Sequence, residues 1–164
     1  MQFFYSPGSC SFASHIVLEE SGVPYRAVRV DLKTKRTETG ADYNTINPRG
    51  YVPSLLLDDG SLLCENAALL PYLGELAPAA QLLPPHGTLA NYRVREWVAY
   101  VCVELHKNNS PLFRPTTPES VKEQQRAILA RRFGYVDGEL RQPFLGGQHF
   151  SVADAYLFVV LSWF

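Results

Sequence analysis

The stretch VPSLLLDDGSLLCENAALLPYLGEL, residues 52–76, decides the fold of this chain of 164 residues. Two short apolar runs, residues 54–57 and 61–64, flank the sequence Asp-Asp-Gly, which is a signal for a tight β-hairpin. Leucines at helical spacing follow Glu65 and Asn66, so a helix is expected directly after the hairpin. The stretch therefore predicts a β-β-α unit.

The residues before this stretch predict a complementary β-α-β unit. Residues 2–5 form a short aromatic run before Ser-Pro-Gly, which is typical of a buried strand that ends in a turn. Residues 9–21 carry apolar side chains at helical spacing, with Gly22 as a C-cap, and residues 24–32 alternate as a second strand. A β-α-β unit followed by β-β-α is the minimal thioredoxin-like pattern, so we expect an α/β thioredoxin-like domain over residues 1–77.

The second half of the chain is predicted to be helical. Residues 78–87 are rich in proline, alanine and glycine, and we expect them to link the first domain to an all-helical domain over residues 88–164. Within that domain, Ser151 and Asp154 have the spacing of a capping box. We therefore interpret Asp154 as a structural carboxylate rather than a catalytic one.

Composition and charge exclude several classes of function. The 15 Lys and Arg residues nearly balance the 16 Asp and Glu residues, without a long run of either sign, so we expect no nucleic-acid partner. The chain lacks a basic, apolar leader and any stretch long enough to span a bilayer, which predicts a cytoplasmic protein without a membrane partner. Cys10, Cys64 and Cys102 are too widely spaced for a disulfide framework or a zinc site, so we expect no metal.

Cys10 is the strongest candidate for chemistry. Its sulfur is expected at the N-terminus of the helix over residues 9–21, where the helix dipole and free N–H groups favour the thiolate. The alternative is inert packing, which is our interpretation of Cys64 and Cys102 in their apolar surroundings. A dithiol oxidoreductase would need a second cysteine at Ala13. Thiol chemistry at Cys10 therefore needs a second thiol from a small molecule.

Other residues describe that small molecule. A cis bond before Pro53 would turn the backbone of Val52 toward a peptide-like ligand. At the next helix start, the N–H groups near Asn66 suit a carboxylate, and the Glu65 carboxylate suits an ammonium group. Lys35, on a polar loop, could meet a second carboxylate. The alternatives are ordinary helix charge placement for Glu65 and a solvated Lys35. A ligand with a thiol, a peptide bond, an α-amino acid head and another carboxylate is glutathione.

Several motifs, in order along the chain, carry a family resemblance. They are YSPGSCSFASHIVLEESG (residues 5–22), NPRGYVPSLLLDDG (47–60), ELHK (104–107) with SPLFRP (110–115), and FSVADAYLF (150–158). Together they resemble the beta-class glutathione transferases, bacterial enzymes with a cysteine at the thiol site. The resemblance implies a thioredoxin-like domain followed by an all-helical one, a homodimer, and glutathione bound at the domain junction.

The resemblance also implies roles for particular residues. It places Cys10 opposite the glutathione sulfur, and it assigns the ends of glutathione to Lys35, the Val52 backbone, Glu65 and Asn66. His106 and Lys107 are implied to reach the site from the helical domain, where His106 could hydrogen-bond a thiolate or take its proton. Without the resemblance, His106 and Lys107 would be interpreted as charges that compensate a helix dipole.

Some features depart from the family pattern. Tyr51 and Asn66 stand where relatives often have a glutamine and a small residue. Ala99 stands where they often have an asparagine that can reach the partner subunit's glutathione. The family also continues through further helices that pack on the helix starting at Ser151, so the all-helical domain is expected to be shortened at its C-terminal end.

Two functions remain open at this point. The first is a glutathione S-transferase that conjugates a hydrophobic electrophile, or exchanges disulfides through Cys10, in a detoxifying role. A cysteine beside the glutathione sulfur favours mixed-disulfide chemistry, so modest conjugation is expected. The electrophile pocket would include Val103, Phe113 and Tyr156. The alternative is a non-catalytic module that binds glutathione or hydrophobic compounds, which is motivated by Ala99 and the short C-terminus.

Overall fold

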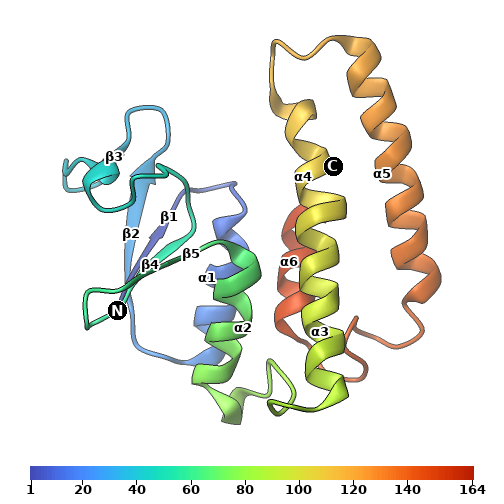
Figure 1. Cartoon of the computed structure of the whole chain (residues 1–164), viewed down its shortest axis with the longest axis horizontal. Helices are drawn as coiled ribbons and strands as arrows, with labels where there is room; N and C mark the ends of the chain where they lie inside the picture. The colour runs from blue at the N-terminus through green and yellow to red at the C-terminus, as the bar shows by residue number, and fades with distance from the viewer.

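A five-stranded mixed sheet and two helices form the N-terminal half of the protein (Figure 1). The computed structural model describes residues 1–164. The sheet has the order β3-β2-β1-β4-β5, in which β1 and β2 are parallel and the other neighbours antiparallel. Its strands are β1 (Gln2–Tyr5), β2 (Arg26–Asp31), β3 (Arg36–Thr37), β4 (Ser54–Leu56) and β5 (Leu62–Cys64). The predicted hairpin is the β4–β5 pair, and the thioredoxin-like fold is confirmed.

The helices α1 (Ser11–Ser21) and α2 (Asn66–Leu76) cover one face of this sheet (Figure 1). Because neighbouring strand residues point to opposite faces, Phe3 packs into the main core while Phe4 packs into a small second core. The second core includes Tyr43, in the 3₁₀ turn η1 (Tyr43–Thr45), which belongs to the long loop between β3 and β4. The starts of α1 and α2 lie next to each other at one end of the sheet (Figure 1).

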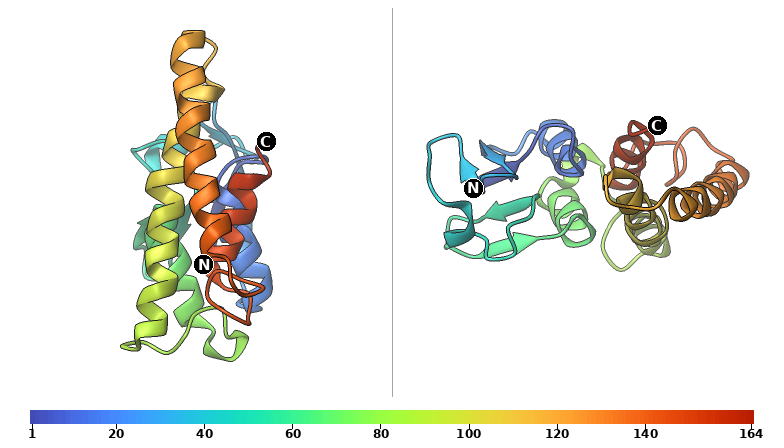
Figure 2. Two further views of the ribbon diagram at one scale, coloured as in Figure 1. Left: turned by 90° about the vertical axis from the view of Figure 1, so that its right-hand side faces the viewer. Right: turned by 90° about the horizontal axis from the view of Figure 1, so that it is seen from above.

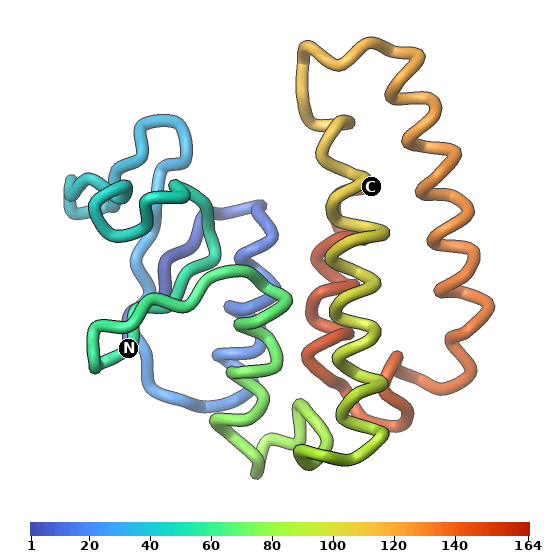
Figure 3. Tube along the Cα trace, viewed as in Figure 1, coloured from blue at the N-terminus to red at the C-terminus, as the bar shows by residue number.

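The C-terminal half is helical (Figure 2). Its elements are α3 (Leu89–Tyr100), the π-helical turn η3 (Val101–His106), α4 (Lys107–Asn109), the 3₁₀ turn η4 (Ser110–Phe113), α5 (Glu119–Glu139) and α6 (Val152–Leu161). The chain trace in Figure 3 shows α5 running beside α3, with α6 on the other side of α3. The segment before α3 contains a further 3₁₀ turn, η2 (Pro78–Ala80).

One hydrophobic core joins the two halves. The buried cluster runs from Phe3 and Val17 in the N-terminal half to Val98 and Val160 in the C-terminal half. Helix α6 packs directly against α1, so the helical half is fixed against the start of the first helix. This shared core positions side chains from both halves around a common cavity.

The start of α6 has the predicted capping box. The Ser151 backbone N–H donates to one oxygen of the Asp154 carboxylate at 2.9 Å, and the Leu145 N–H donates to the other oxygen at 2.8 Å. Asp154 therefore forms the capping box that its spacing from Ser151 predicts.

Two features of the fold were not predicted. Strand β3 has only two residues, too few to produce an alternating pattern. The long helix that begins with α3 contains the π-helical turn η3, in which the Lys107 N–H donates to the Cys102 carbonyl, five residues earlier. None of the helices combines the length and the apolar character that crossing a membrane requires.

Candidate functional site

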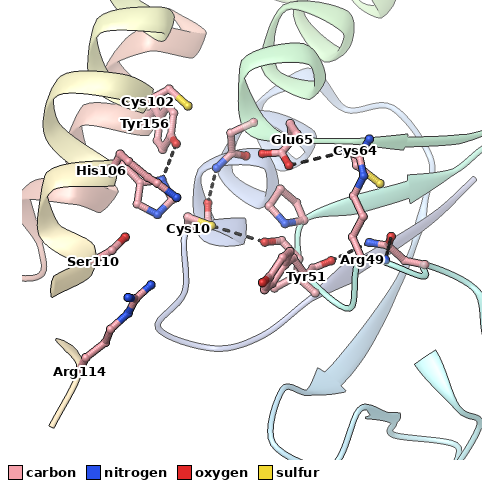
Figure 4. Close-up of a pocket in the computed structure, with 15 residues that line it drawn as sticks. Cys10, Arg49, Tyr51, Cys64, Glu65, Cys102, His106, Ser110, Arg114 and Tyr156 are labelled. Atoms are coloured by element: carbon pink, nitrogen blue, oxygen red, sulfur yellow. Dashed lines mark hydrogen bonds and ion pairs between the residues drawn. The ribbon is translucent and has the colours of Figure 1, made fainter. Parts of the chain in front are cut away.

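A cavity of about 360 Å³ lies between the two halves of the protein (Figure 4). One wall comes from the start of α1, the loop before β4 and the start of α2; it includes Cys10, Val52 and Glu65. The opposite wall comes from η3, α4, η4 and α6, and it includes His106 and Tyr156. The predicted site residues Cys10, Val52, Pro53, Glu65, Asn66, His106 and Lys107 all line this cavity.

Cys10 occupies the N-cap position of α1. Its thiol donates to the Val52 carbonyl across the cavity wall, at an Sγ–O distance of 3.5 Å. The peptide bond between Val52 and Pro53 is cis, the conformation that the predicted role of the Val52 backbone requires, and Val52 itself is buried. The carbonyl that was predicted to be free for a ligand is therefore occupied by the Cys10 thiol in this structure.

The protonation state of Cys10 differs from the prediction. Burial between the two halves, with a smaller contribution from the negative charge of Glu65, raises the pKa of Cys10 from 9.0 to about 12. The position at the helix N-terminus does not compensate for this loss of hydration. The expected thiolate is therefore wrong for the free protein, in which Cys10 is a neutral thiol at pH 7.

Glu65 lies in an unusual backbone conformation at the start of α2. Its φ angle is 72°, in the left-handed region that residues other than glycine rarely adopt. Such strain is often found at functional sites. The Glu65 carboxylate lies 3.6 Å from the Arg49 guanidinium, and both side chains are largely exposed. This pair is open to exchange with the charged groups of a ligand.

The Asn66 side chain makes its hydrogen bonds to other residues of the protein. Asn66 is 3% exposed; its amide nitrogen donates to the Cys10 carbonyl at 2.8 Å, and its amide oxygen accepts from the Ser14 hydroxyl at 2.7 Å. These bonds tie the starts of α1 and α2 together. Because Asn66 is the first residue of α2, its backbone N–H has no acceptor within the helix and suits an anion.

His106 is paired with a residue from α6. Its Nδ1 lies 2.6 Å from the Tyr156 hydroxyl, and the Trp163 ring packs edge-on against the imidazole at a centroid distance of 5.1 Å. Burial lowers the pKa of His106, and the positive charge of Lys107 lowers it further. Burial raises the pKa of Tyr156, which is 1% exposed. At neutral pH both groups are therefore uncharged.

Lys35 lies beside the cavity but does not line it. Its ammonium donates to the Gly50 carbonyl at 2.8 Å and lies 5.7 Å from the centre of the Tyr51 ring. Tyr51 itself lines the cavity. Lys35 would thus have to leave its Gly50 partner to reach a ligand.

Several residues of the cavity were not predicted from the sequence. Arg49, Ser110 and Arg114 line it, although Ser110 and Arg114 begin and nearly end the SPLFRP motif that carried the resemblance. Cys64 and Cys102, which were interpreted as packing residues, also line it; both are half-buried, and Cys102 packs against the main hydrophobic core.

The expected electrophile pocket is only partly correct. Tyr156 lines the cavity as expected, whereas Val103 and Phe113 do not line it and are more than half exposed.

Comparison with known protein families gives two matches. The family described as "Glutathione S-transferase, N-terminal domain" matches residues 8–76, and "Glutathione S-transferase, C-terminal domain" matches residues 97–164. Among curated proteins, glutathione S-transferase GstA of Escherichia coli O157:H7 is 50% identical over 164 residues, covering 99% of this chain and 82% of that protein.

Solved structures agree with these matches. A sphingomonad glutathione S-transferase complexed with glutathione superposes with a TM-score of 0.95 at 42% identity. The beta-class glutathione S-transferase of Sphingomonas chungbukensis superposes with a TM-score of 0.93 at 44% identity. In both cases the match covers 99% of this chain and 82% of the other.

Proposed function

The chain belongs to the glutathione S-transferase family and is a transferase that uses glutathione as thiol co-substrate; we propose that its reaction takes place in the cavity beside Cys10. Its relatives are named as transferases, and this argues against the non-catalytic binding module. The second substrate is proposed to be a hydrophobic electrophile, with disulfide exchange as a slower side reaction.

The position of Cys10 is the observation that carries this proposal. Its thiol stands at the start of α1, on the wall that also presents the Val52 backbone and the start of α2. A glutathione molecule whose sulfur met Cys10 would displace the 3.5 Å contact between Sγ and the Val52 carbonyl. That carbonyl would then accept from a peptide N–H of the ligand, as a strand edge does.

The ends of glutathione have charge partners around the cavity. The ammonium group would meet the Glu65 carboxylate in place of Arg49, and the neighbouring carboxylate would meet the Asn66 backbone N–H at the start of α2. The glycine carboxylate would meet Lys107 or Lys35, of which Lys107 already lines the cavity. The Asn66 side chain holds this wall in shape through its bonds to Ser14 and Cys10.

The raised pKa of Cys10 supports conjugation as the main reaction. In conjugation the glutathione thiol gives its proton to solvent. Its sulfur then forms a bond to an electrophilic carbon, and the leaving group departs with the bonding pair. A neutral Cys10 S–H donates a hydrogen bond to the glutathione thiolate, and His106 is the neighbouring group that can add a second. Exchange instead requires Cys10 to lose its own proton before it attacks a disulfide, and this is unfavourable at neutral pH.

We also propose that the protein is a cytoplasmic homodimer. Leu89, Tyr92, Ala99 and Val103 form an exposed stripe along α3 and η3 at helical spacing, and such a stripe suits contact with a second copy. The three cysteines are unpaired, which is typical of a reducing compartment.

Two substitutions at Cys10 test the proposal. Serine keeps a hydrogen-bond donor, so Cys10→Ser should retain conjugation of a chlorodinitrobenzene; Cys10→Ala removes the donor and should lower kcat/KM about tenfold, the size expected of one hydrogen bond. Both variants should lose glutathione-dependent disulfide reduction. Equal conjugation by all three forms would contradict the role of the thiol.

Intact-mass spectrometry supplies the matched control. After treatment with glutathione disulfide, the native protein and the Cys64→Ser and Cys102→Ser variants should slowly gain one reducible glutathione. The Cys10→Ser variant should not. An adduct that persists in Cys10→Ser would place the reacting thiol elsewhere in the cavity.

A further inference from the structure

The other contacts of His106 and Tyr156 show which of the two groups donates the hydrogen bond between them. The two groups come from η3 and α6, and they meet at 2.6 Å between Nδ1 and the hydroxyl oxygen. Either group could donate, because a neutral imidazole has two tautomers and a phenol can donate or accept. The neighbours of the Tyr156 hydroxyl decide between them.

The Asn66 amide does not take the Tyr156 proton. Its nitrogen donates to the Cys10 carbonyl and its oxygen accepts from the Ser14 hydroxyl, and no hydrogen bond joins it to Tyr156. The Tyr156 proton therefore needs another acceptor.

His106 Nδ1 is the only hydrogen-bond partner of the Tyr156 hydroxyl. A buried O–H group that lacks an acceptor is costly, and the lone pair of a neutral imidazole is a strong acceptor. The 2.6 Å distance is short even for an O–H donor. Tyr156 is almost fully buried and is uncharged, so it keeps the proton that this bond requires. The bond thus runs from the Tyr156 hydroxyl to Nδ1.

We propose that Tyr156 is the positioning residue for His106: its hydroxyl donates to Nδ1, so the neutral imidazole carries its own proton on Nε2 and presents an N–H donor to the sulfur bound beside Cys10. This inference rests on the proposed function for the identity of that sulfur. Figure 4 shows the His106 ring between the Tyr156 hydroxyl and Cys10. In this tautomer His106 stabilises a thiolate by donation and does not take the thiol proton at Nε2.

The groups that face His106 agree with a neutral donor. Lys107 adds a positive charge from the adjoining position, Tyr156 faces it from α6, and Cys10 and Cys102 line the same cavity. No carboxylate among the described residues forms an ion pair with His106. Nothing nearby would therefore favour the imidazolium.

The tautomer of His106 can be measured without turnover. In protein labelled with ¹⁵N-histidine, two-bond ¹⁵N–¹H correlation spectra at pH 7.5 should show His106 protonated on Nε2 alone; the signals that disappear in His106→Gln give the assignment among the four histidines. In Tyr156→Phe, which keeps the ring and removes the hydroxyl, His106 should become a mixture of tautomers. Protonation on Nδ1 in the native protein, or an unchanged tautomer in Tyr156→Phe, would overturn the proposal.

Kinetics separate positioning from a general structural effect. Tyr156→Phe should lower kcat for conjugation about tenfold, the size of one hydrogen bond, and leave KM for glutathione within twofold. Tyr135→Phe is the matched control, because the Tyr135 hydroxyl on α5 makes no hydrogen bond and lies outside the cavity; it should not change kcat. A loss in KM alone, or an equal loss in both variants, would contradict positioning. If the native protein conjugates no electrophile, the proposed function fails, and the tautomer measurement still decides this inference.

Discussion

The two walls of the cavity are built from different kinds of groups. The N-terminal wall contains backbone groups and buried side chains that are already hydrogen-bonded: Asn66 joins Ser14 to Cys10, and the Cys10 thiol donates to Val52. The exposed ion pair of Arg49 and Glu65 lies beside them. On the helical wall, the exposed side chains of Lys107 and Arg114 stand free of ion pairs, around the buried His106–Tyr156 pair.

This difference suits a reaction with one constant and one variable substrate. Glutathione is the same in every turnover, so a wall whose backbone and buried groups are already fixed can bind it with a smaller loss of conformational entropy. Electrophiles differ in shape and charge, and long exposed side chains can adapt to them at a cost in affinity. Changes to the first wall should therefore have large effects, and changes to the exposed part of the second should have small ones.

The largest expected effect concerns the reactivity of Cys10 in the first wall. A pKa of about 12 leaves about one part in 10⁵ of Cys10 as thiolate at pH 7, against a few per cent of an ordinary free thiol. Alkylation by iodoacetamide should thus be about 1,000-fold slower than for free cysteine, and it should rise about tenfold per pH unit between pH 7 and 10.

The Cys64→Ser/Cys102→Ser double variant isolates this thiol for the measurement. Mass spectrometry gives the rate, and the same variant unfolded in urea is the control that should react like free cysteine. Rapid alkylation of the folded protein at pH 7 would show that the helix N-terminus, rather than burial, controls the Cys10 thiol.

The next effect concerns the support of the helical wall. Asp154 accepts hydrogen bonds from the backbone N–H groups of Ser151 and Leu145 at the start of α6, the helix that carries Tyr156. Asp154→Ala should lower the free energy of unfolding by about 2–3 kcal/mol, because several donors lose their partner together. Urea denaturation measures the change. Asp137→Ala, at an exposed position on α5, should change stability by less than about 0.5 kcal/mol.

A smaller effect is expected from the bond that ties the starts of α1 and α2. Asn66→Ala should cost about 1–2 kcal/mol of stability, since it leaves the Cys10 carbonyl and the Ser14 hydroxyl without this partner. KM for glutathione should rise severalfold, because the wall that binds glutathione loses its fixed geometry. Asn108→Ala, which removes a half-buried bond to the Glu104 carbonyl on the other wall, should leave KM unchanged. An equal change of KM in both variants would remove the distinction between the walls.

The smallest effect should come from the exposed helical wall. Arg114 lines the cavity without an ion-pair partner. Arg114→Gln should therefore raise KM for an electrophile that carries a carboxylate by up to about fivefold, the range of an exposed charge pair. A neutral electrophile and glutathione should keep their KM values. Arg126→Gln, which breaks an exposed pair with Glu119 outside the cavity, should change KM for neither substrate. A large rise in KM for glutathione in Arg114→Gln would mean that the two walls share the binding of glutathione.

Much of the fold follows from local sequence patterns. The hairpin between β4 and β5 follows from apolar runs around Asp-Asp-Gly, and α1 and α2 follow from helical spacing after a strand. Cys10 and Glu65 could be chosen as candidates because each lies where an element begins. Positions of this kind are set by neighbours in the chain, so a single sequence contains the information.

The rest of the site depends on contacts between distant residues. Tyr156 contacts His106, which lies 50 positions earlier in the sequence, and no spacing pattern predicts such a pair. The charge state of Cys10 was predicted wrongly because it depends on burial by the second half of the protein, which overrides the local influence of the helix start. That Cys64 and Cys102 line the cavity was not predicted, because apolar neighbours in sequence do not reveal an opening between two domains.

The π-helical turn η3 contains one residue more than an α-helical segment with the same rise along the axis. That residue sets the phase of everything after it, so His106 and Lys107 are rotated by about 100° from where an uninterrupted helix would place them. Deleting the exposed Val103 should therefore turn η3 into an ordinary α-helical turn and leave His106 facing Tyr156. When related chains are aligned, a one-residue gap in this turn is therefore compatible with an unchanged position of His106.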